Sequence, residues 1–134
     1  MAQTNISKKI LSNKQTLLDD YKLAWLSRHA SIIGRKEVLG GKAKFGIFGD
    51  GKEVPQLALA HFFNKGDWRS GYYRDQTLMM ALGLMNLNTF FGQLYGNTDL
   101  EYNPDNGGRL MNNHFASRSL DEYGDWKVLT EQNN

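Results

Sequence analysis

Hydrophobic residues in the first third of the chain recur every three to four positions. The series is Leu17, Leu18, Tyr21, Ala24, Trp25 and Ile32. Such spacing places side chains on one face of an amphipathic helix. We expect this helix over residues 15–39. It should end at Gly40-Gly41, because glycine readily takes the left-handed conformation found at helix C-termini.

Weaker patterns divide the rest of the chain into short elements. We expect a helix over 53–63 with Pro55 in its first turn, a short strand over 68–73, where "WRSGYY" alternates, and helical spacing over 74–85. Asn88 is expected to cap a further helix, "TFFGQLYG", which ends at Gly96-Asn97 and is followed by a loop over 97–113. The pattern predicts a single, mainly α unit with a few short strands, made of a helical segment over about 1–44 and a second part over about 45–134.

Composition and charge limit which binding partners and which cellular compartment we expect for this protein. The 134 residues correspond to about one domain, and 16 basic against 14 acidic residues give a net charge of +2, too weak to indicate a nucleic-acid partner. Residues 1–44 carry nine Lys/Arg and three Asp/Glu, which marks either a solvated helix face or a docking surface. The chain has no cysteine, no apolar run long enough to cross a membrane and no signal-peptide core. We therefore expect a soluble, cytoplasmic protein that makes no membrane contact.

The stretch "FGIFGDGKE" contains Gly49-Asp50-Gly51, a tripeptide that can mark a magnesium site for a diphosphate. Such a site needs a second oxygen ligand, typically an asparagine about two dozen residues downstream. That window holds "YRDQTL", and Asn86 lies 35 residues past Gly51. We therefore interpret the tripeptide as a turn before the helix at 53 and expect no metal ligand at Asp50.

Tyr72-Tyr73-Arg74-Asp75 is a candidate for anion binding. An arginine that opens a helix can direct its guanidinium toward a phosphate, and tyrosines beside it can stack or donate hydrogen bonds. The alternative is a surface Arg74–Asp75 environment with the tyrosines half inside the core. The residues themselves do not separate these alternatives.

A second candidate lies in the glycine-rich loop "GGRLMNNHFASRS". Arg109, His114, Ser117 and Arg118 there could gather around an anion or a substrate carboxylate. His29 and His61 lie in helical patterns and are interpreted as packing or surface residues. No histidines occur at metal-ligand spacing.

Four segments, in this order, resemble the thiamine diphosphate-dependent dehydrogenase component of 2-oxo acid dehydrogenase complexes. The segments are "GDGKEVPQLALAHFFNKGDW", "GYYRDQ", "FFGQLYGNTDL" and "GGRLMNNHFASRSL". The resemblance covers about residues 20–130 and is to the N-terminal part of the alpha subunit or alpha–beta fusion, of branched-chain (2-oxoisovalerate) or pyruvate type. Two departures stand out: Gln76 replaces a frequent histidine, and residues 101–106 form an insertion.

The resemblance implies a role for several residues. Tyr73 and Arg74 match the pair that reaches the cofactor. Arg109, His114 and Ser117 match the active-site loop, with His114 as the candidate catalytic residue. The family's magnesium motif and the catalytic histidines of the beta-like half lie outside the matched region. The chain is thus expected to be an inactive N-terminal fragment of an α/β thiamine diphosphate-binding fold, with the cofactor and magnesium bound tightly only by the intact protein.

The intact protein is then expected to decarboxylate a 2-oxo acid oxidatively and to pass the acyl group to a lipoyl acyltransferase component. Its partners would include a beta-like half or subunit, and self-association into a homo-oligomer is also expected. The rival interpretation is a small helical protein-interaction module without catalytic activity. The absence of a complete catalytic set within the chain favours that rival.

Overall fold

The computed structural model describes residues 13–64, 67, 69–113 and 115, and its longest element is the helix α2 (Lys14–Leu39). The Oδ1 atom of Asn13 caps its start by accepting hydrogen bonds from the backbone N–H groups of Gln15 (3.0 Å) and Thr16 (3.3 Å). At the other end, Gly41 has a φ of 74°, as predicted for the glycine pair that follows this helix. The predicted helix over 15–39 is confirmed.

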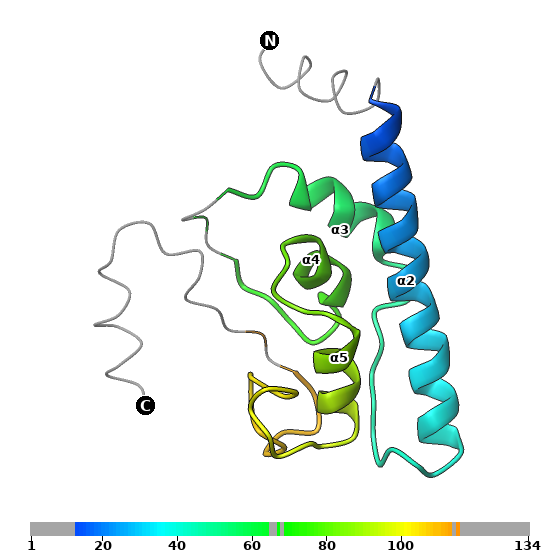
Figure 1. The fold of residues 1–134 in the computed structure, drawn as a ribbon, viewed down its shortest axis with the longest axis vertical. Helices are drawn as coiled ribbons and strands as arrows, with labels where there is room; N and C mark the ends of the chain where they lie inside the picture. The colour runs from blue at the N-terminus through cyan, green and yellow to red at the C-terminus, as the bar shows by residue number, and fades with distance from the viewer. Residues whose placement is uncertain (1–12, 65–66, 68, 114, 116–134) are drawn as a thin grey trace, which may run out of the picture.

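Three short helices pack against α2: α3 (Glu53–Ala60), α4 (Gln76–Ala81) and α5 (Leu87–Leu94). Figure 1 shows all three on the same side of α2, which forms one edge of the described region. The core lies between these helices and is built mainly from α4 and the segment that follows it. Its buried members are Ala30, Leu78, Met79, Met80, Met85 and Phe90.

The face of α2 that points to this core is small and partly polar. Its buried residues are Ser27, Ala30, Ser31 and Gly34. A Cβ atom at Gly34 would lie 2.5 Å from the ring of Phe48, so only a small residue allows the helix to lie this close. The series that predicted the helix contributes little to the core, since Leu18, Tyr21 and Trp25 are exposed. Hydrophobic periodicity identified the helix, but side-chain size determines which face is buried.

The expected strand over 68–73 is wrong for residues 69–73, and the part of the chain that the structure describes contains no strand. The reason is local. The N–H of Asp75 donates to the carbonyl of Tyr72 (3.1 Å), and the N–H of Tyr72 donates to the carboxylate of Asp75 (2.9 Å). These bonds close a turn, whereas a strand would need its backbone groups free for a neighbouring strand. The mainly helical character is confirmed.

Several predicted helix boundaries also need correction. The helix expected over 53–63 ends at Ala60, and the one expected over 74–85 covers only 76–81. Leu84 and Gly83 donate to the carbonyls of Met79 (2.9 Å) and Met80 (3.1 Å), which closes the end of α4. The cap of α5 is Asn86 rather than Asn88. Its side chain and that of Thr89 exchange backbone hydrogen bonds in a capping box.

Candidate functional site

Tyr73 and Arg74 lie in the turn that leads into α4. Tyr73 is half-buried and Arg74 is exposed. The guanidinium carbon of Arg74 lies 5.5 Å from the centroid of the Tyr73 ring, a cation–π contact. The ring of Tyr72 lies 3.8 Å from that of Tyr73, measured between centroids. Within the described ranges Arg74 makes no ion pair, so its charge has no carboxylate partner there.

Tyr73 borders a small hollow to which three other parts of the chain contribute. Phe48 precedes Gly49, Gln93 comes from α5, and Asn112 and Asn113 come from the glycine-rich loop. The hollow has a volume of about 20 Å³, which is room for a water molecule and not for a cofactor.

The backbone of Arg74 is held from two sides. The side-chain amide of Gln56, on α3, donates to the Arg74 carbonyl (2.9 Å) and accepts from the N–H of Leu78 (2.9 Å). From the other side, Gly49 approaches so closely that a Cβ atom there would lie 2.4 Å from the Arg74 carbonyl oxygen. Because glycine has no Cβ atom, the backbone at position 49 can lie directly beside the Arg74 carbonyl group.

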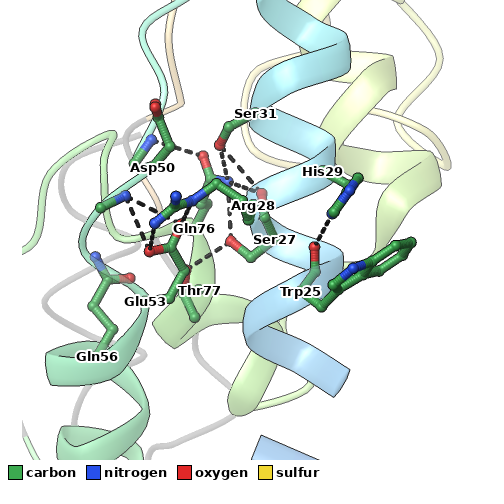
Figure 2. Close-up of polar contacts among 12 residues, drawn as sticks. Trp25, Ser27, Arg28, His29, Ser31, Asp50, Glu53, Gln56, Gln76 and Thr77 are labelled. Atoms are coloured by element: carbon green, nitrogen blue, oxygen red, sulfur yellow. Dashed lines mark hydrogen bonds and ion pairs between the residues drawn. The ribbon is translucent and has the colours of Figure 1, made fainter. Parts of the chain in front are cut away.

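A buried polar cluster lies behind this turn, between α2 and α4 (Figure 2). The amide nitrogen of Gln76 donates to the hydroxyls of Ser27 (3.1 Å) and Ser31 (2.9 Å), and its oxygen accepts from the N–H of Gly49 (3.1 Å). The hydroxyls of Ser27 and Thr77 are 2.7 Å apart. All four side chains are buried, so each depends on these partners to replace water.

The Gly49-Asp50-Gly51 tripeptide forms the predicted turn. Gly51 has a φ of 88°, and α3 begins at Glu53. The buried Glu53 carboxylate accepts from the N–H of Gly51 (3.0 Å) and from two nitrogens of Arg28 (2.7 and 2.8 Å). These hydrogen bonds, led by that of Arg28, lower the pKa of Glu53 to about 2, whereas burial raises it. The carboxylate stays charged at neutral pH, and the pKa of Arg28 is correspondingly raised.

Asp50 is engaged by an arginine. Its carboxylate lies 2.7 Å from a guanidinium nitrogen of Arg35. Among the described residues, no group of three or more His, Asp or Glu side chains could hold a metal ion. The residues nearest the tripeptide are therefore arranged as ion pairs between α2 and the turn.

The glycine-rich loop is only partly described. Arg109 is exposed and does not border the hollow, whereas Asn112 and Asn113 do. The candidate residues His114, Ser117 and Arg118 lie outside the described residues. Of the candidate residues that the structure describes, Tyr73 borders the hollow, whereas Asn112 and Asn113, which also border it, were not among the candidates.

Three buried asparagines, two before Arg109 and one after it, organise the glycine-rich loop. Asn103 donates to the side-chain oxygen of Asn106 (3.1 Å), and Asn106 donates to that of Asn113 (3.1 Å). The Oδ1 atom of Asn103 is buried and has no hydrogen-bond partner among the described residues. The interior of this loop is therefore polar, and its buried asparagines bond mainly to one another.

Sequence reasoning also missed the cluster around Gln76 and the pair of Arg28 with Glu53. A signal was present for the cluster. Ser27 and Ser31 are four residues apart and thus on one helix face, and Gln76 opens an apolar run. For the ion pair, 25 residues separate the partners, and single-sequence patterns do not relate positions so far apart.

No protein-family model matches the chain, and neither does any solved structure. Within the described ranges, no helix combines the length and apolar character needed to span a membrane.

Proposed function

We propose that this chain is the N-terminal part of a thiamine diphosphate-dependent 2-oxo acid dehydrogenase component and that it contributes one wall of the cofactor site. The observation that supports the proposal most directly is that two segments distant in the sequence meet at the hollow. Tyr73, from "GYYRDQ", and Asn112 and Asn113, from "GGRLMNNH", border it together. These are two of the segments on which the resemblance depends.

The exposed guanidinium of Arg74 suits a diphosphate. A guanidinium donates charge-assisted hydrogen bonds to phosphate oxygens, often through two nitrogens at once. The ring of Tyr73 supports the cation from one side, and the phenol can donate a further hydrogen bond. Gln56 and Gly49 fix the backbone from which Arg74 extends, so the direction of the side chain is restricted near its base.

When bound, thiamine diphosphate supplies the nucleophilic carbon and electron sink for the decarboxylation of a 2-oxo acid. The tasks left to this chain are binding and orientation. Arg74 would balance part of the diphosphate charge, and Tyr73 would limit access of water from its side. The magnesium ligands and catalytic histidines would come from other parts of the intact cytoplasmic enzyme, which would transfer the acyl group to its lipoyl partner.

The test is a titration of the chain with thiamine diphosphate and Mg²⁺, followed by amide NMR. We expect weak binding, with shifts concentrated around Tyr73, Arg74 and the 112–113 segment. Arg74→Ala should abolish these shifts, and Lys52→Ala, which removes another exposed cation, should preserve them. Thiamine without its diphosphate should leave the Arg74 amide unchanged.

Two results would contradict the proposal. Shifts that persist in Arg74→Ala would exclude the assigned anion contact. Tight, magnesium-dependent binding in calorimetry would exclude the idea that the chain forms only one wall of the site.

A second candidate function is a helical interaction module without catalytic activity. The observation that favours it is the exposure of large apolar residues on α2, among them Tyr21 and Trp25. A chain of this kind would show no response to thiamine diphosphate in the same titration.

A further inference from the structure

Arg69 is a mostly buried cation between the Tyr73–Arg74 turn and the glycine-rich loop. Its side chain is 18% exposed. One terminal guanidinium nitrogen donates to the carboxylate of Asp75 (2.9 Å). The other donates to the carbonyl of Phe115 (3.1 Å) and to the sulfur of Met79 (3.5 Å). A charge removed from water needs such partners, and the planar guanidinium can bind several of them in different directions at once.

Asp75 connects Arg69 to the start of α4. The carboxylate oxygen that accepts from Arg69 also accepts from the N–H of Tyr72 (2.9 Å). In return, the N–H of Asp75 donates to the carbonyl of Tyr72 (3.1 Å). These bonds close the turn that includes Tyr73 and Arg74. Arg69 is therefore bonded to the carboxylate that fixes this turn.

Phe115 connects Arg69 to the hollow. It borders the hollow, as Tyr73 and Asn112 do, and it packs against the hydrophobic core. The guanidinium carbon of Arg69 lies 6.0 Å from the centroid of the Phe115 ring, at the outer limit of a cation–π contact. Arg69 and Phe115 are 46 positions apart in the sequence. One side chain thus joins two distant segments that border the same hollow.

The guanidinium of Arg69 lies directly against the backbone of Gly71. A Cβ atom at Gly71 would lie 1.1 Å from a terminal nitrogen of that guanidinium. Any side chain at position 71 would therefore displace the guanidinium, and only glycine permits the contact. Because the displaced group is the far end of a flexible side chain, the backbone itself need not move.

We propose that Arg69 is a positioning residue, which holds the glycine-rich loop at Phe115 in a fixed position relative to the Tyr73–Arg74 turn. It acts through Asp75 and Phe115, since these contacts already engage both terminal nitrogens of its guanidinium. A consequence that rests on the proposed function is that Arg69 determines how well the turn and the loop bind thiamine diphosphate together.

Amide NMR of the whole chain without ligand tests the positioning. Arg69→Lys keeps a positive charge for Asp75 but lacks the second nitrogen that reaches Phe115. We expect altered amide shifts at Asn112, Asn113 and Phe115, with little change at Tyr72. Ser70→Ala, an exposed change next to Arg69, should leave the loop amides as they are in the wild type.

Gly71→Ala provides a second variant, which keeps Arg69 but occupies the place of its guanidinium. It should move the loop amides in the same direction as Arg69→Lys. The double variant should move them no further, because both substitutions remove the same contact. A general loss of stability would not produce this pattern. Circular dichroism checks that each variant is folded.

A titration of the same variants with thiamine diphosphate and Mg²⁺ tests the consequence for binding. Arg69→Lys and Gly71→Ala should each raise the Kd about tenfold, the effect of one lost charge-assisted hydrogen bond. Ser70→Ala should leave the Kd unchanged. A wild-type chain that gave no response would contradict the proposed function, whereas the ligand-free spectra would still decide the role of Arg69.

Two outcomes would overturn the proposal. Loop amides that stay unchanged in Arg69→Lys or in Gly71→Ala would show that the loop keeps its position without this contact. Additive changes in the double variant would show that Arg69 and Gly71 act separately.

Discussion

The guanidinium of Arg28 and the carboxylate of Glu53 form a bidentate ion pair, with N–O distances of 2.7 and 2.8 Å. The pair joins the middle of α2 to the first turn of α3. Arg28 is half-exposed and Glu53 is buried, so the carboxylate depends more on the contact than the arginine does. The same carboxylate accepts from the N–H of Gly51, which ties the glycine turn to both helices.

Glu53→Gln should destabilise the chain by about 2 kcal/mol at neutral pH, because it removes the charge that two Arg28 nitrogens bind. The folded-state pKa of Glu53 is about 2, below its ordinary value of 4.5. The stabilisation is therefore complete above pH 4.5 and is lost as the pH falls toward 2. Urea denaturation at several pH values should show the gap between wild type and variant closing over that range. A gap that stays constant with pH would contradict this assignment, and Glu101→Gln serves as an exposed control.

Gln76→Leu should be more damaging than its change in volume suggests. The variant removes the acceptor for the buried N–H of Gly49 and the donor to Ser31, and leucine replaces neither. Leaving such groups without partners should cost about 3 kcal/mol. Thermal and urea denaturation measure the loss, with Gln15→Leu on the exposed start of α2 as the matched control. Equal stability of the two variants would show that the buried cluster contributes little.

Gly49→Ala tests the close approach to Arg74. The added methyl group would lie 2.4 Å from the Arg74 carbonyl oxygen, so the turn must move. We expect a loss of about 1–3 kcal/mol, typical of overpacking, together with amide shifts at Arg74 and Leu78. Ser70→Ala, an exposed change nearby, should have almost no effect. If Gly49→Ala left these amides unchanged, the contact would not be what fixes the turn.

The sequence predicted α2 closely because its signals are local. The periodic apolar residues extend over many turns, and Gly40-Gly41 ends the helix whatever packs around it. The shorter helices were placed less accurately. Their ends depend on single hydrogen bonds, such as those from Asn86 and Thr89 at the start of α5.

Which face of α2 is buried was not predictable from hydrophobicity. The contact with α4 is made by Ser27 and Ser31, whose hydroxyls find partners in Gln76 and Thr77. Those partners are about 50 residues away in the chain, and no local pattern indicates them. The same limit applies to the hollow, since no local pattern relates Tyr73 to Asn112 and Asn113.

The backbone contacts at Arg74 affect how much conformational entropy the protein would lose on binding a ligand there. Gln56 and Gly49 already hold the backbone at this position, so a ligand that bound the guanidinium would not have to order the turn. It would restrict only the side-chain rotamers of Arg74, a cost of up to about 2 kcal/mol, and not the additional 1–2 kcal/mol for each backbone residue fixed. Even a weak contact with an anion would therefore keep most of its interaction energy as affinity.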